Sequence, residues 1–242
     1  MKYLFIFILS FLVSCAQQTA LTGGEKDVNA PILIIDSTKE IINFNQSSIL
    51  LKFNENVQFI DGNKGFITNP EIKNIEVIQD KKNLEIKWED SLTSNTTYSF
   101  LFLNSITDMT ESNKISSFNY IISTGYYLDS GSISGQVDKY PEKSILENSL
   151  VKLVSISNSD FFYKTYSNKN GEFKIDNIKK GEYLMSSFID ENDNLILDTT
   201  TEVHGFLLDT IFIKDSSGFK NIINYEPQKT ASLDKVKFNN LG

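Results

Sequence analysis

The chain contains no arginine, and it has one cysteine and one histidine among its 242 residues. All 23 basic residues are therefore lysines, so the bidentate guanidinium contacts that bind phosphate or carboxylate groups are missing. A single cysteine excludes disulfides within the chain and thiolate metal sites, and a single histidine, His204, excludes zinc sites built on histidine pairs. One histidine also leaves few options for acid–base catalysis near neutral pH.

Acidic residues outnumber basic ones, with 31 against 23, and the formal net charge is −8 at pH 7. Nucleic acid and anionic membrane surfaces repel such a body, so we exclude nucleic acid as a partner. Hydrophobic residues make up 40% of the chain and aromatic residues 12%, which is enough to bury one large core or two small ones.

The N-terminus has the anatomy of an export signal. Lys2 is followed by an apolar stretch over residues 4–13 and then by Ser14 and Cys15. The stretch is too short to span a bilayer, which takes about 20 apolar residues. We predict a signal peptide over residues 1–14 and a flexible tether over residues 15–30, because the latter are mostly small and polar and include two glycines.

The four residues from Leu12 to Cys15 resemble the lipobox of bacterial lipoproteins. The resemblance implies cleavage before Cys15, a diacylglycerol on its sulfur and an acyl chain on its amine. Two or more acyl chains hold a protein stably at a membrane, whereas one binds only marginally. We therefore expect a soluble body anchored by lipid at the outer membrane, facing either the periplasm or the exterior.

An ordinary signal peptide with an incidental cysteine is the alternative. An exported thiol without a partner would be reactive, which disfavours that interpretation.

Beyond the tether, short runs of alternating apolar and polar residues indicate β-strands. The runs at residues 75–78 and 84–88 predict a hairpin that places Leu84, Ile86 and Trp88 on one face. Strands recur about every ten residues with polar turns between them, and no helical period of useful length occurs. The predicted fold class is all-β.

Four blocks stand in order in the first half of the chain, at residues 53–57, 92–98, 104–108 and 118–125. Together they resemble the SbsA-type bacterial Ig-like domain, which implies a β-sandwich over residues 31–125. The chain departs from that family by lacking a proline-rich opening after the first strand.

A second series of strands begins near residue 130. It contains a Gly-x-Val opening at Gly135, an Asn-Gly-x-Phe turn at Asn170 and an Ile-x-x-Gly-x-Tyr spacing that starts at Ile178. These features resemble the carboxypeptidase-regulatory-like, or prealbumin-like, β-sandwich. The glycine of the Asn-Gly turn supplies the positive φ that such a hairpin needs.

The predicted organisation is two tandem β-sandwich domains, Ig-like over residues 31–125 and prealbumin-like over residues 130–214. Residues 215–242 form a C-terminal strand or tail. Two such units after a lipobox resemble a lipoprotein architecture common in Bacteroidetes.

The densest cluster of candidate metal ligands consists of Asp190, Asn192, Asn194 and Asp198. Their oxygens follow the i, i+2, i+4 spacing of loops that wrap a hard cation such as Ca²⁺. The glycine of an EF-type loop is missing, and Thr201 stands where a bidentate acid would be expected. The alternative is a plain polar turn, because asparagine and aspartate are common in turns.

Catalysis has no support in the residue pattern, so we predict that the protein is not an enzyme. No Gly-x-Ser-x-Gly elbow occurs, and His204 would have to serve any triad. The carboxylates of Glu55, Glu89 and Asp90 lie in turn-like contexts, and the sequence alone does not show the carboxyl separation that glycoside hydrolysis requires.

The leading functional hypothesis is a lipid-anchored envelope protein that binds or scaffolds other envelope components, for example within an outer-membrane protein complex. Exposed strand edges of β-sandwiches can accept a partner strand. The alternative is a carbohydrate-binding surface lipoprotein, for which residues 161–163, Tyr126 and Tyr127 are the candidate aromatic side chains. An enzyme is the least supported class.

Overall fold

The computed structural model describes residues 24–34, 41–60, 62 and 64–227. These residues form 18 strands and no helix, which confirms the predicted all-β class with two β-sandwiches in tandem. No helix long and apolar enough to cross a bilayer is present in this part of the chain.

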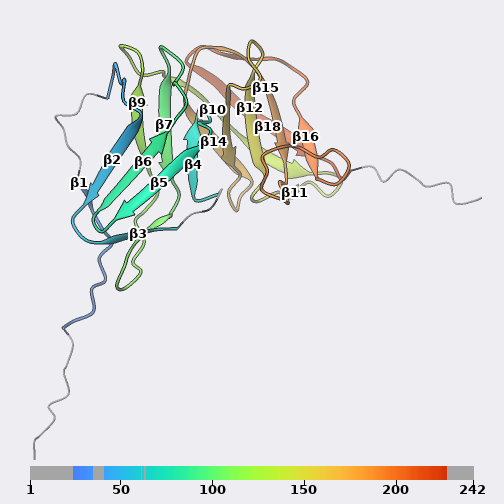
Figure 1. The fold of residues 1–242 in the computed structure, drawn as a ribbon. Coiled ribbons are helices and arrows are strands. Elements are labelled where there is room, and N and C mark those ends of the chain that lie inside the picture. The colour runs from blue at the N-terminus through green and yellow to red at the C-terminus, as the bar shows by residue number, and fades with distance from the viewer. Residues whose placement is uncertain (1–23, 35–40, 61, 63, 228–242) are drawn as a thin grey trace, which may run out of the picture.

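The first sandwich packs a four-stranded sheet in the order β1-β2-β6-β5 against a three-stranded sheet in the order β4-β7-β9, and β3 pairs with β8 (Figure 1). All pairings in it are antiparallel. The bounds are β1 (Leu33–Ile34), β2 (Ser48–Phe53), β3 (Val57–Phe59), β4 (Phe66–Asn69), β5 (Ile75–Asp80), β6 (Asn83–Trp88), β7 (Thr97–Phe102), β8 (Ile106–Asp108) and β9 (Phe118–Ser123).

The core of the first sandwich follows from the alternation of its strands. On β6 the predicted face of Leu84, Ile86 and Trp88 is buried, and the Trp88 ring lies 5.5 Å from that of Phe100 on β7. The β5–β6 hairpin is confirmed, but its turn is shorter than expected from the run of polar residues. Asp80 at the end of β5 pairs with Asn83 at the start of β6, so that only Lys81 and Lys82 connect the two strands.

The second sandwich packs a sheet around β10 against a sheet around β12 and β15. The first sheet has the order β11-β10-β14 with β18 on β10, and the second has the order β13-β12-β15 with β16 and β17 both on β15. The bounds are β10 (Gly131–Lys139), β11 (Ser144–Ile145), β12 (Leu150–Ser155), β13 (Phe162–Tyr166), β14 (Glu172–Ile178), β15 (Gly181–Phe188), β16 (His204–Phe206), β17 (Ile211–Ile213) and β18 (Ser216–Asn224).

Strand β18 lies in residues 215–242, for which the sequence pattern predicted a C-terminal strand or tail, and it belongs to the second sandwich. β18 pairs in parallel with β10, and its Ile222 is buried in the same core as Ile133 and Val137 of β10. A parallel pairing between strands so far apart in the chain leaves no local sequence signal, because only the tertiary fold brings the two strands together. The Asn-Gly turn follows the prediction, with Gly171 at φ 72°.

Candidate functional site

The predicted lipidation site, Cys15, lies outside the described residues, as do the signal peptide and most of the tether. The anchor therefore stays a prediction from sequence. The described chain begins at Gly24 beside the first sandwich.

The predicted Ca²⁺ ligands lie in the loop that follows β15. Asp190 accepts the backbone N–H groups of Asn194 at 3.1 Å and Leu195 at 2.8 Å. The side-chain oxygens of Asn192 and Asn194 accept the N–H groups of Asn194 and Ile196. These contacts are the asparagine and aspartate turns that the alternative interpretation describes.

Two further carboxylates close the same loop. Asp198 accepts both the N–H and the hydroxyl of Thr200, and those contacts lower the pKa of its carboxyl group. The buried Glu202 accepts the N–H groups of Glu191 and Asp198. Among residues 24–227 as described, no three His, Cys, Asp or Glu side chains converge as metal ligands would. Ca²⁺ binding stays a prediction, in a loop whose acceptors already serve the backbone.

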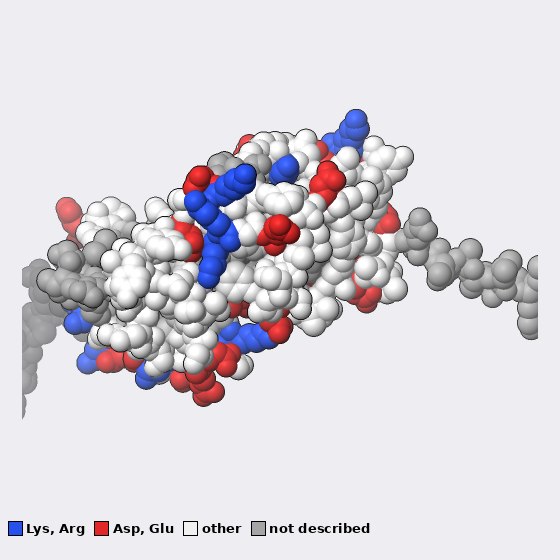
Figure 2. Space-filling view, turned by 90° about the horizontal axis from the view of Figure 1, so that it is seen from above, with Lys and Arg blue, Asp and Glu red and all other residues white. Residues whose placement is uncertain are grey.

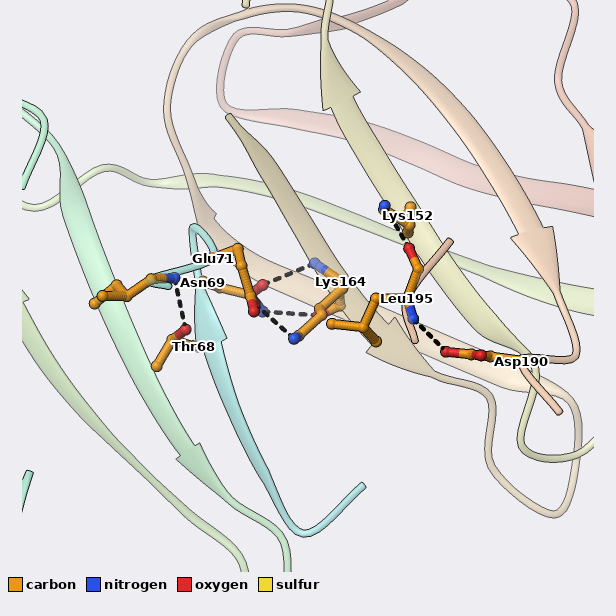
Figure 3. Close-up of polar contacts among 8 residues, drawn as sticks. Thr68, Asn69, Glu71, Lys152, Lys164, Asp190 and Leu195 are labelled. Carbon is orange, nitrogen blue, oxygen red and sulfur yellow. Dashed lines mark hydrogen bonds and ion pairs between the residues drawn. The ribbon is translucent and has the colours of Figure 1, made fainter. Parts of the chain in front are cut away.

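A hydrogen-bonded seam joins the two sandwiches along β4 and β13 (Figure 3). The side chain of Asn69 donates to the carbonyl of Lys164 at 2.9 Å and accepts its N–H at 2.7 Å, as a neighbouring strand would. Two residues further on, the N–H of Glu71 donates to the carbonyl of Phe162 at 2.9 Å. The backbone edge of β13 is thereby covered by the first sandwich, which protects it from pairing with another chain.

A buried ion pair lies at this seam. Lys164 Nζ is 2.6 Å from Glu71 Oε2, and the two side chains are 7% and 16% exposed. The contact is an ion pair without the alignment of a hydrogen bond. Beside it, burial lowers the pKa of the Lys152 ammonium, and the charge of Lys164 lowers it further. Lys152 also lies 4.1 Å from the centre of the Phe162 ring, where a cation–π contact offsets part of its desolvation.

The linker between the sandwiches, residues 124–130, is held by hydrogen bonds as well. Asp129 accepts the N–H of Thr97 at 2.9 Å, and its own N–H donates to the hydroxyl of Thr97 at 2.6 Å. From the second sandwich, Asn177 donates to the carbonyl of Asp129, and Lys179 donates to the carbonyl of Ser94. The linker residue Asp129 is therefore hydrogen-bonded to both sandwiches, and Lys179 adds a direct contact between them.

The two aromatic clusters predicted as carbohydrate contacts, residues 161–163 and the pair Tyr126 and Tyr127, differ in burial. Tyr163 is buried in the second core, with Phe161 packed against it, and Phe162 lies under Lys152. Tyr126 and Tyr127 are exposed in the linker, at 80% and 58%. Residues 161–163 thus serve the fold, and only the linker pair is available at the surface.

A groove of about 780 Å³ lies at the end of the second sandwich, where β16 meets the end of β18. Two aromatic pairs contribute to its lining. The rings of Tyr140 and Tyr225 are 5.1 Å apart, and those of His204 and Phe206 are 5.6 Å apart. Leu208 also lines the groove and is 96% exposed. This site was not predicted from the sequence, because its side chains come from three separate segments.

Close backbone packing builds the groove. His204 and Tyr225 exchange two backbone hydrogen bonds of 3.1 and 2.8 Å, and Tyr140 donates its N–H to the carbonyl of Asn224 at 2.8 Å. A Cβ atom at Gly205 would come within 2.2 Å of the carbonyl oxygen of Ile223. Only glycine lets β16 approach β18 this closely.

The first sandwich can be assigned by comparison with known families. Residues 28–123 match the bacterial Ig-like domain. The match covers less than half of the chain, and it agrees at the level of the Ig-like domain with the resemblance found in residues 31–125. No curated protein matches the chain.

Several solved structures show distant similarity to the chain. BcpA, the major pilin subunit of Bacillus cereus, is 13% identical, covering 74% of this chain and 64% of its own, with a TM-score of 0.28. The Bacillus anthracis TIE protein is 12% identical, covering 84% of this chain and 42% of its own, with a TM-score of 0.28. The N-terminal part of the bacterial S-layer protein SbsC is 11% identical, covering 68% and 42%, with a TM-score of 0.27. The chain spans less than two-thirds of the length of each of these structures.

Proposed function

We propose that this protein is a non-catalytic binding module of the cell envelope, held at the outer membrane by lipid on Cys15. The observation that carries the proposal is the seam between the sandwiches, where Asn69 and the Glu71–Lys164 pair join them into one unit. A joined pair of sandwiches acts as a spacer, because it separates the lipid anchor at one end from the binding partner at the other end.

The arrangement of the chain suits that role. In Figure 1 the described N-terminal segment enters beside the first sandwich, whereas β16 and the end of the described chain lie at the far end of the second. A lipid on Cys15 would attach the chain at the end of the body that carries the first sandwich, and the groove lies at the opposite end. The resemblances to SbsA-type, carboxypeptidase-regulatory-like and Bacteroidetes lipoprotein sequences support this proposal.

The negative net charge of the chain supports a partner other than nucleic acid. In Figure 2 acidic and basic side chains are interspersed, one run of lysines crosses the middle, and most of the visible face is uncharged.

His204 packs against Phe206, and its Nδ1 lies 2.8 Å from the carbonyl oxygen of Glu202, which is a structural contact. The described residues hold no group of three His, Cys, Asp or Glu side chains that could bind a metal ion.

Replacing the predicted lipid attachment residue tests the anchor. We expect wild-type protein to incorporate labelled palmitate and to stay in the envelope fraction, and Cys15→Ala to lose both properties, because no acyl chain then holds it. Ser14→Ala is the matched control, since it keeps a small residue before the cysteine. A Cys15→Ala protein that stays in the envelope as before would contradict the proposal.

A further inference from the structure

The groove at the end of the second sandwich is lined by aromatic rings and hydroxyl groups, and these groups indicate the class of its ligand. Its lining combines the rings of Tyr140, Phe206 and Tyr225 with hydroxyl groups from both tyrosines, Thr199 and Thr200. Phe206 is 52% exposed, and the two tyrosines are exposed to a similar extent, at 52% and 49%. Half-exposed aromatic rings beside hydroxyl groups offer flat apolar surfaces and hydrogen-bonding edges in the same place.

Charge narrows the choice of ligand. Apart from the single histidine, the only ionisable acid or base in the lining besides the tyrosines is Glu226, and its carboxylate pairs with Lys139. The same carboxylate raises the pKa of Lys139, so the ammonium stays protonated beside it. The lining itself contains no lysine for a phosphate, sulfate or carboxylate ligand, and its one carboxylate already pairs with Lys139. An uncharged ligand matches this surface.

The histidine adds a directed polar group. Nδ1 of His204 lies 2.8 Å from the carbonyl oxygen of Glu202, which can only accept a hydrogen bond. In the neutral ring Nδ1 is then the donor and Nε2 the acceptor. The lining thus combines the imidazole of His204 with the hydroxyl groups of the two tyrosines and Thr199. The hydroxyl of Thr200 donates to Asp198 and can still accept a hydrogen bond.

We propose that this groove binds an uncharged oligosaccharide. A sugar ring has one face of C–H groups, which stacks on aromatic rings, and an edge of hydroxyl groups, which hydrogen-bonds to side chains such as those of Tyr140 and Tyr225. A volume of about 780 Å³ lies in the range of ligand sites and exceeds what one sugar ring fills. A purely apolar ligand would leave the hydroxyl groups of the lining unpaired at a cost.

This inference rests on the proposed function only in treating the body as a binding module, and it does not depend on the lipid. It moves carbohydrate binding away from residues 161–163, which serve the core and the seam, and away from Tyr126 and Tyr127, which lie outside the groove, to a surface assembled by the fold. Failure of the Cys15 experiment would leave it intact, because sugar binding is measured on purified protein.

Titration of the full chain in detergent with soluble, uncharged oligosaccharides tests the proposal. The probes are four- to six-unit chains of glucose, mannose, galactose and N-acetylglucosamine, and the readouts are calorimetry and saturation-transfer NMR. We expect at least one probe to bind. We expect Tyr140→Ala and Phe206→Ala to weaken that binding on the order of tenfold, since aromatic side chains at the centre of a site carry most of the affinity.

Two matched controls lie outside the groove. Tyr126→Ala removes a tyrosine that is 80% exposed, and Phe212→Ala removes a phenylalanine that is 59% exposed. Neither should change the affinity by more than about twofold, as for contacts outside a hot spot. Thermal melting of all four variants shows whether each remains folded, and Phe206→Tyr, which keeps a ring, should retain binding.

Two outcomes would overturn the proposal. One is that none of the probes binds the folded wild-type chain. The other is that a probe binds, but the groove variants and the control variants change its affinity by the same factor. A change of sedimentation with Tyr140→Ala or Phe206→Ala, in the absence of sugar binding, would assign the groove to self-association instead.

Discussion

Lys164 is the side chain on which the seam between the sandwiches depends most. Its backbone pairs with the side chain of Asn69, and its ammonium, almost fully removed from water, lies 2.6 Å from the carboxylate of Glu71. A buried charge is tolerated when a counter-ion lies beside it, and it becomes costly when that counter-ion is removed. The energetic role of Glu71 is therefore to neutralise Lys164.

We predict that Glu71→Ala lowers the free energy of unfolding by about 3–5 kcal/mol, because it leaves Lys164 buried without a counter-ion. The matched control is Lys73→Ala, which removes the solvent-exposed pair with Asp160 at the same seam and should cost less than about 1 kcal/mol. Urea unfolding measures both.

The double variant Glu71→Leu, Lys164→Met removes both charges and should recover most of the stability lost by Glu71→Ala. Equal effects of Glu71→Ala and Lys73→Ala would contradict this account of the pair.

At the scale of elements, the loop between β15 and β16 is organised by its own backbone. Asp190 and Glu202 each accept two N–H groups of that loop, and Asp198 accepts the N–H and hydroxyl of Thr200. Such contacts order a loop without a cation. The i, i+2 spacing of acidic and amide side chains is common to this kind of turn and to Ca²⁺ loops, which is why the sequence left both open.

From this geometry we expect Asp190→Ala to lower stability by about 1–3 kcal/mol, because two backbone donors lose their acceptor. Ca²⁺ titration separates the two interpretations of the loop: if it is only a polar turn, millimolar Ca²⁺ leaves the melting temperature of the wild-type chain unchanged, with Mg²⁺ as the control cation. A rise in melting temperature with Ca²⁺ that Asp190→Ala abolishes would instead establish a Ca²⁺ site at Asp190, Asn192, Asn194 and Asp198.

At the scale of the whole molecule, the sandwiches have separate hydrophobic cores but share a seam. One core contains Trp88 and Phe100, and the other contains Tyr163 and Phe173. Polar contacts between them include the hydrogen bonds of Asn69 with Lys164 and of Asn177 with the linker. Two cores coupled by such contacts unfold together when the coupling is strong compared with the stability difference between them.

We predict that the wild-type chain unfolds in urea with one midpoint. Fluorescence of Trp88, the only tryptophan, reports on the first sandwich, and far-ultraviolet circular dichroism reports on both. Asn69→Ala removes two hydrogen bonds of the seam and should separate the two midpoints, whereas Lys73→Ala should not. Two midpoints in the wild-type chain would show that the seam does not couple the sandwiches.

Local patterns were sufficient wherever neighbouring residues decide the structure. Alternation placed Leu84, Ile86 and Trp88 on a buried face, and the Asn-Gly turn predicted the positive φ of Gly171. Such features depend on contacts within a strand or a hairpin, whose residues follow one another in the sequence. The absence of arginine and the single histidine likewise restrict the chemistry of the protein whatever its fold, because no packing can supply a side chain that the chain lacks.

The tertiary structure alone decided which distant residues meet. β18 pairs with β10, Asn69 pairs with Lys164, and Tyr140 joins Phe206 and Tyr225 around one groove. Each of these contacts joins segments far apart in the chain, and their partners are chosen by the packing of whole sheets. Composition and spacing determine strands, turns and charge, whereas a seam and a groove exist only after the sheets have come together.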